Sequence, residues 1–134
     1  MKDCIFCQIS KGDAKSWKVY EDENVCAFFD YNPVNAYHTL IVPKKHYDNI
    51  FDIPEDELQR VMTVVKKIVI MYNQKLGIKN IQIINSSGAE AQQDVFHIHF
   101  HVVPRRTGDN QNIKRIPHIE LRENFDELIE KLNQ

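Results

Sequence analysis

The chain has 134 residues, 43% of them hydrophobic and 27% charged, a composition that fits a globular protein with one core. Its formal net charge of −2 argues against a nucleic-acid partner, and no apolar run reaches the roughly 20 residues of a membrane helix. Residues 1–4 lack the apolar stretch of a signal peptide, so we expect a cytoplasmic protein. Three cysteines, an odd number, argue against a disulfide framework and favour metal binding or burial.

Hydrophobic periodicity predicts short elements in the first third of the chain. The sequence indicates a short helical turn at 4–11 and strands at 18–20 and 25–29, with an acidic hairpin turn between the two strands. A third strand is expected at 39–42, where Pro43 ends it.

The clearest predicted element is a long helix that starts at Pro54. The acidic residues 55–57 suit the positive end of the helix dipole, and apolar residues then recur at spacings of three and four as far as Leu76. Gly77 is a suitable residue to end the helix.

The second half of the sequence predicts two more strands, at 81–84 and 95–103, which a polar loop separates. An irregular segment at 105–118 leads to a short amphipathic helix, whose apolar residues are Phe125, Leu128, Ile129 and Leu132. The element order predicts an α+β fold, in which one long helix packs on an antiparallel sheet of about five strands and a short helix follows at the C-terminus.

Residues 95–103 read Val-Phe-His-Ile-His-Phe-His-Val-Val. In a strand, His97, His99 and His101 share one face, whereas Phe96, Ile98, Phe100 and Val102 share the other and can enter the core. Such a row of imidazoles can supply a nucleophile and hydrogen-bond donors to a phosphate group. The alternatives are a zinc site made from all three histidines, or polar residues on a solvated strand face.

His97–Val103 matches His-φ-His-φ-His-φ-φ, where φ is an apolar residue, and therefore resembles the motif of the histidine triad (HIT) superfamily. Three further segments stand in the family order: Cys4-Ile-Phe-Cys7, Asp30 after two phenylalanines, and the segment from His38 to His46. The resemblance is greatest to the Hint branch in its bacterial, zinc-containing form. It implies one HIT domain over residues 1–134, with its core at about 4–106 and a C-terminal tail at 107–134.

The resemblance implies that His99 is the nucleophile, which attacks the α-phosphorus of a nucleotide and forms a covalent nucleotidyl-histidine. His101 matches a residue that contacts the phosphate. His38 matches a further histidine of the same pocket, where it would set the proton positions around His99. Without the aligned motif, a lone histidine on an apolar strand such as His38 is more often a core or surface residue than a site residue.

Asp30 matches the acidic residue that binds the ribose hydroxyls, although it is also a common turn residue before Asn32-Pro33. The apolar walls around the base are expected from residues that could equally belong to the core: Ile5, Phe6, Phe28 and Tyr31.

The loop before the triad departs from the family pattern. Its polar position falls on Asn85 by residue type or on Ser86 by counting back from Gly88, and Gln92 replaces a common glycine. Asp94 occupies a position that often holds serine or an acid. A carboxylate there is expected to disfavour an anionic substrate and to tolerate a cationic leaving amine.

Cys4 and Cys7 form a Cys-x-x-Cys motif, which alone fits a redox pair, a metal site or coincidence. In zinc-bearing relatives the other two ligands match His46 and His97. The resemblance therefore implies a structural zinc site, with His99 and His101 left for chemistry. Cys26 has no partner and is expected in the core.

The leading hypothesis is a purine-nucleotide phosphoramidate or nucleotidyl hydrolase. The alternatives are a dinucleoside polyphosphate (Ap4A-type) hydrolase, a nucleotide-binding regulatory protein with little turnover, and a zinc-dependent interaction module. Family members are usually homodimers that pair through the long helix and a neighbouring strand. The long helix of this chain carries the apolar residues Met62, Val65, Val69 and Tyr72, which could form that interface or face the protein's own sheet.

Overall fold

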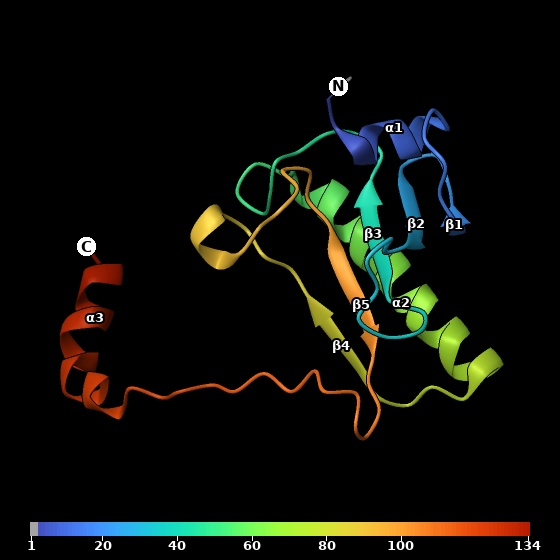
Figure 1. Ribbon diagram of the computed structural model, residues 1–134. Helices are drawn as coiled ribbons and strands as arrows, with labels where there is room; N and C mark the ends of the chain where they lie inside the picture. The colour runs from blue at the N-terminus through green and yellow to red at the C-terminus, as the bar shows by residue number, and fades with distance from the viewer. Residues whose placement is uncertain (1–2) are drawn as a thin grey trace.

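The computed structural model describes residues 3–134 (Figure 1). Its centre is a five-stranded sheet in the order β1-β2-β3-β5-β4, in which every neighbouring pair is antiparallel. The strands are β1 (Lys18–Glu21), β2 (Val25–Phe29), β3 (Thr39–Pro43), β4 (Ile81–Ile84) and β5 (Phe100–Pro104). The predicted α+β fold is therefore confirmed.

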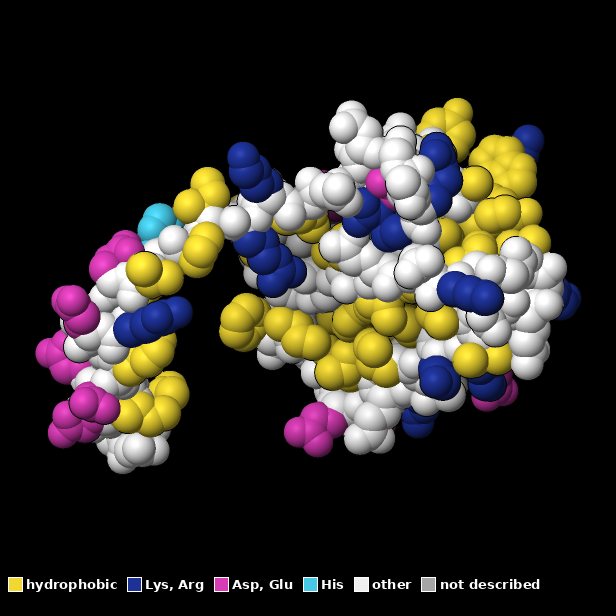
Figure 2. Space-filling view, turned by 90° about the horizontal axis from the view of Figure 1, so that it is seen from below, with side chains coloured by type: hydrophobic (Ala, Val, Ile, Leu, Met, Phe, Trp, Pro, Cys, Tyr) yellow, Lys and Arg dark blue, Asp and Glu magenta, His cyan; other side chains and the backbone are white. Residues whose placement is uncertain are grey.

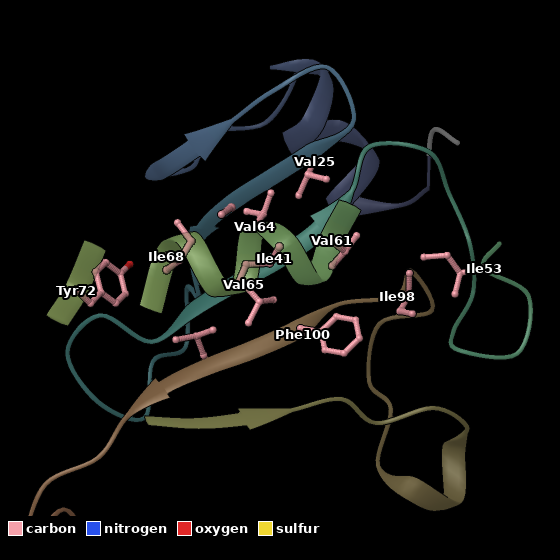
Figure 3. Close-up of a cluster of buried hydrophobic side chains, with 12 residues drawn as sticks. Val25, Ile41, Ile53, Val61, Val64, Val65, Ile68, Tyr72, Ile98 and Phe100 are labelled. Carbon is pink, nitrogen blue, oxygen red and sulfur yellow. The ribbon is translucent and has the colours of Figure 1, made fainter. Parts of the chain in front are cut away.

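The long helix α2 (Glu55–Leu76) covers one face of this sheet (Figures 1 and 3). Pro54 immediately precedes its first residue, and Gly77 ends it with a φ of 69°, a conformation that glycine adopts without a steric penalty. The apolar side of α2 packs on alternate residues of the central strands, as Figure 3 shows for Val61, Val65 and Ile68 against Val25 and Ile41. This layer is the main core.

The short helix α1 (Ile5–Lys11) packs on the opposite face of the sheet. Strand side chains alternate, so Cys26, Phe28, Leu40 and Val42 point away from α2 and form a second apolar cluster with α1. The expected burial of Cys26 is confirmed, since its side chain is inaccessible to solvent. The candidate site lies on this side of the sheet.

The last central strand is shorter than the sequence predicts, because β5 begins only at Phe100. The backbone just before it bonds elsewhere: the N–H of Ile98 donates to the carbonyl of Tyr47 at 2.8 Å, and side chains occupy the carbonyls of His97 and His99. His97 and His99 therefore precede the strand instead of lying on it. Phe96, expected in the core, is 48% exposed.

The C-terminal segment leaves the sheet after β5 and projects away from it (Figure 1). It is irregular until the 3₁₀ helix η2 (Ile119–Asn124) and the helix α3 (Phe125–Leu132), which confirms the predicted C-terminal helix. The apolar face of α3 is turned toward the body across an open gap (Figure 2), and none of its residues is buried. Within the described residues, no helix is long and apolar enough to cross a membrane.

Candidate functional site

A cavity of about 310 Å³ opens on the α1 side of the sheet. Its polar wall carries Asp30, Asp94, His99 and His101. The predicted apolar residues also line it, together with others that the sequence did not single out: Ile5, Phe6, Ile9, Trp17, Phe28, Phe29, Tyr31 and Leu40. The cavity therefore joins an apolar compartment to a row of titratable groups, as a binding site for a small molecule does.

Aromatic rings organise the apolar compartment. Phe6 lies edge-on to Phe28 and to His99, with ring centroids 5.5 and 5.1 Å apart. At the mouth, Trp17 stacks on Tyr31 at 6.2 Å, and the Lys15 ammonium lies 5.1 Å from the centre of the Trp17 ring. Trp17 is half exposed at this mouth, and its being the only tryptophan in the chain is the one signal by which the sequence could have identified it as a binding residue.

The proton position on His99 follows from its contacts. Its Nδ1 lies 2.8 Å from the carbonyl oxygen of His97. A carbonyl only accepts hydrogen bonds, so Nδ1 carries the proton in the neutral ring and Nε2 keeps a lone pair. Nε2 lies 3.5 Å from Oδ1 of Asp94 at the cavity wall. The nitrogen that lines the cavity side is thus the one able to act as a nucleophile.

His38 and His101 form a hydrogen-bonded pair. The backbone N–H of Val34 donates to Nδ1 of His38 at 3.1 Å, so the proton of His38 lies on Nε2. That Nε2 donates to Nδ1 of His101 at 2.9 Å, which leaves the proton of His101 on its own Nε2. The contact brings His38 to the site, as the resemblance implied, and presents His101 as a hydrogen-bond donor.

Burial keeps both rings of this pair neutral. The pKa of His101 is lowered to about 4 by burial and by the neighbouring His99 and His38. The pKa of His38 is lowered by burial, against the opposing charge of Asp30. At neutral pH the pair therefore offers directed hydrogen bonds without a formal positive charge.

The two carboxylate oxygens of Asp30 face different partners, one in the turn and one in the site. Its Oδ1 accepts the N–H of Asn32 at 2.9 Å, which is the turn role. Its Oδ2 lies 3.4 Å from Nε2 of His38 and 3.9 Å from Nδ1 of His101. The donor atoms of Asp30, His38 and His101 also lie within 4.8 Å of one another, but the 2.9 Å hydrogen bond between the two imidazoles already accounts for their contact.

A second cluster has the donor set of a metal centre. Cys4, Cys7, His46 and His97 each offer one donor atom, and these atoms lie within 4.8 Å of one another. Nδ1 of His97 is 3.2 and 3.4 Å from the two sulfur atoms, and Nδ1 of His46 is 3.5 Å from Sγ of Cys7. Sulfur and nitrogen ligands on one tetrahedral zinc stand about 3.6 Å apart, so the spacing fits that ion.

The outer contacts of the two histidines support this fit. Nε2 of His97 donates to the carbonyl of Pro43 at 2.8 Å, and Nε2 of His46 donates to Asp48 at 3.1 Å. Each ring therefore keeps the lone pair on the Nδ1 that faces the sulfur atoms, as metal-binding histidines do. Burial lowers the pKa of His97 to about 4 and raises the pKa of the Cys4 thiol, so a thiolate here needs a neighbouring cation.

The polar residues of the loop before the histidines differ from one another in their contacts. Nδ2 of Asn85 donates to the carbonyl of His99 at 3.0 Å, whereas the Ser86 hydroxyl makes no side-chain hydrogen bond within residues 3–134. Gln92 has a φ of 71°, so it keeps the backbone conformation that the common glycine would allow. Gln93, which the sequence did not single out, ties the loop together through the N–H of Gly88 and two carbonyls.

The family model of the HIT domain matches residues 11–108. The chain is 48% identical to an uncharacterized HIT-like protein of Methanocaldococcus jannaschii, over 83% of this chain and 85% of that one. It is 36% identical to the adenosine 5'-monophosphoramidase HNT1 of Candida albicans, over 77% and 70% of the two chains. It is 33% identical to the adenylylsulfatase HINT3 of Arabidopsis thaliana, over 80% of this chain but 54% of the relative.

Solved structures of the same family superpose on this chain. A HIT family protein of Bacillus anthracis superposes with a TM-score of 0.89 and 32% identity over 98% of this chain and 95% of the other. That coverage includes nearly all of the projecting C-terminal segment. A zinc-bound histidine triad protein of Mycobacterium smegmatis superposes with a TM-score of 0.78 and 35% identity, over 97% and 98% of the two chains.

Proposed function

This chain belongs to the HIT domain family, and from that premise we propose that it hydrolyses a bond at the α-phosphate of a purine nucleotide. The observation that carries the proposal is the hydrogen bond from Nδ1 of His99 to the carbonyl of His97. It leaves the lone pair of Nε2 at the wall of the cavity, where it can attack phosphorus.

The reaction has two displacements. In the first, Nε2 of His99 bonds to the α-phosphorus, and the bond from phosphorus to the leaving nitrogen or oxygen breaks. The leaving group departs with that electron pair and takes up a proton, so a phosphoramidate releases an amine. In the second, water attacks the phosphorus and gives up a proton, which balances the one taken up in the first step, the bond to Nε2 breaks and the nucleoside monophosphate leaves. Splitting one displacement into two lowers each barrier.

Other residues hold the substrate. His101 presents its Nε2 proton to a phosphate oxygen, because His38 holds the opposite nitrogen of the ring. Asp30 accepts the ribose hydroxyls at the edge of the cavity, and Phe6 and Phe28 flank the base on the α1 side. The named relatives that act on adenylyl compounds support this substrate class.

The proposal is tested by hydrolysis of adenosine phosphoramidate and Ap4A, measured side by side for the wild type and His99→Ala. We expect faster cleavage of the phosphoramidate and no measurable turnover by the variant, while nucleotide still raises the unfolding temperature of both proteins. Faster cleavage of Ap4A would favour the dinucleoside polyphosphate hydrolase. Tight nucleotide binding without turnover would favour the regulatory protein, and turnover by His99→Ala would overturn the nucleophile.

We also propose that Cys4, Cys7, His46 and His97 hold a structural zinc ion. Four protein ligands would complete the coordination shell, so the ion would supply rigidity and no open position for substrate. Cys4 is the N-cap of α1, with its sulfur accepting the N–H of Cys7 at 3.3 Å. Metal binding there would fix α1, and with it Phe6, against the histidine segment.

We further propose a homodimer. On α2, Val65 and Tyr72 face the chain's own core and Val69 packs against it, which leaves Met62 as the exposed member of the expected patch. The projecting C-terminal segment offers more apolar surface: Ile113, Ile116, Ile119, Leu121, Phe125, Leu128, Ile129 and Leu132 are all more than 48% exposed. A helix as short as α3 is unstable alone in water, and the segment stands away from its own body, so a second copy is the partner that fits it (Figure 2).

A further inference from the structure

We infer that Asp94 selects the leaving group of the proposed reaction, and that it favours cationic amines over anionic polyphosphates. The inference depends on the proposed hydrolysis through His99 and narrows its substrate class. It concerns the one wall of the cavity where a negative charge stands beside the attacking nitrogen.

Asp94 stands beside the attacking nitrogen. Its Oδ1 is 3.5 Å from Nε2 of His99, and the side chain is 77% exposed. The same oxygen accepts the N–H of Val95 at 2.8 Å, which holds the carboxylate in this direction. Asp94 is thus a fixed charge at the open edge of the reaction centre.

A second hollow begins at Asp94. It has a volume of about 440 Å³ and shares Ile5, Asp94 and Val95 with the nucleotide cavity. Its further wall includes the carboxylates of Asp3 and Asp48, and it contains none of the residues expected to hold the ribose. The side of the reaction centre away from Asp30 is therefore acidic.

Cys4 and His46 also line this second hollow, but a zinc ion bound there by two thiolates would carry no net charge, so it would not offset these carboxylates. Among the described residues that line the nucleotide cavity, Lys15 is the only lysine or arginine, and it lies over Trp17 at the aromatic mouth. A polyphosphate leaving group carries several negative charges into the acidic region. An amine leaving group, by contrast, brings no such negative charge, and the carboxylates attract any cationic group that it carries.

The size of the effect follows from distance. With the phosphorus about 3 Å from Nε2 and the leaving atom in line beyond it, that atom stands about 6 Å from the Asp94 carboxylate. Two unit charges at this separation, at an effective dielectric constant of about 40, change a rate by about tenfold. Each unit charge on the leaving group should therefore change the cleavage rate by a measurable factor.

The test uses three adenosine phosphoramidates whose amines carry an ammonium, an acetamide or a carboxylate on the same short linker. We measure kcat/KM for the wild type, Asp94→Asn, and the control Glu90→Gln, which removes a carboxylate from the same loop outside both hollows. We expect Asp94→Asn to lower the preference for the cationic over the anionic amine by up to about 100-fold, because the two amines differ by two unit charges, to change the acetamide substrate less than either charged one, and to improve Ap4A cleavage. Glu90→Gln should retain the wild-type preference.

Two results would overturn the inference. An equal loss on all three substrates would mean that Asp94 orients His99 and does not discriminate, and an unchanged preference would mean that its charge is not felt. If the wild type cleaves none of the substrates, the proposed hydrolysis itself fails, so the two failures are distinguishable. Because Asp94 is mostly exposed, the substitution should leave the unfolding temperature unchanged.

Discussion

Nε2 of His38 lies 2.9 Å from Nδ1 of His101, and the backbone N–H of Val34 holds the other nitrogen of His38. The chain of donors fixes which nitrogen of His101 carries its proton. A fixed donor is already oriented for the phosphate before substrate arrives, so no reorganisation is needed in the transition state.

Replacing His38 should therefore lower kcat by about 100-fold without a comparable change in KM, because the proton of His101 would no longer be fixed. Steady-state kinetics on adenosine phosphoramidate measures kcat and KM separately. The variant His38→Gln keeps an acceptor for Val34 and a donor for His101, and should recover part of the loss seen in His38→Leu. Equal activity of the Gln and Leu variants would count against a role for the hydrogen bond.

The depressed pKa of His101 makes stability depend on pH. The folded protein holds this ring neutral with a pKa of about 4, whereas the unfolded chain takes up the proton near pH 6.5. The stabilisation is therefore complete above about pH 6.5 and is lost as the pH falls toward 4, by at most about 3 kcal/mol. Denaturant unfolding of the wild type and His101→Gln at several pH values should show a flatter dependence for the variant. Parallel curves would contradict this, since metal loss at low pH is common to both proteins.

Removing the metal site should lower stability more than chemistry. The double variant Cys4→Ser, Cys7→Ser should lose bound zinc and unfold about 10 °C or more below the wild type, because a ligand that binds only the folded chain stabilises it. Metal analysis and thermal unfolding measure both effects. Cys26→Ala is the matched control: it removes a buried thiol outside the cluster and should keep the metal. A chelated wild type that unfolds at the original temperature would refute a structural role.

The sequence allowed either Asn85 or Ser86 at the polar loop position, and their contacts in the structure differ. Only Asn85 contacts the histidine segment, through the carbonyl of His99. We expect Asn85→Ala to lower kcat by about tenfold, because a freed carbonyl lets the nucleophile shift. Ser86→Ala should have the activity of the wild type. Equal effects of the two variants would show that the loop acts as a whole.

Much of the fold was predictable because periodicity reports which face of an element is buried. The bounds of α2 and the positions of all five strands follow from that pattern, and Gly77 marks the end of the helix as expected. The strand at 95–103 was predicted too long for a physical reason. Alternation also arises where histidine side chains take up backbone carbonyls, as His99 does with His97, and such pairing replaces the sheet ladder.

The site was predictable only through several motifs in one order. Spacing alone does not bring Cys4 to His97, since the two are far apart in the chain and meet only when α1 packs beside β2 and β3. The contact between His38 and His101 likewise depends on the pairing of β3 with β5. Trp17 was missed because it lies outside any periodic element, where residue type is the only signal.

The projecting C-terminal segment should control assembly. Ending the chain after Asn112 removes the exposed apolar residues of that segment, so a dimer should dissociate to monomers at concentrations where the full chain remains paired. Light scattering coupled to gel filtration measures the mass of each. Within the full chain, Leu128→Asp should have the same effect, whereas the control Glu130→Gln, which changes a polar residue of the same helix, should remain a dimer. A full chain that is monomeric at all concentrations would refute the dimer, and a truncated chain that stays dimeric would move the interface to another surface, such as the edge strand β4, where Ile83 is 48% exposed.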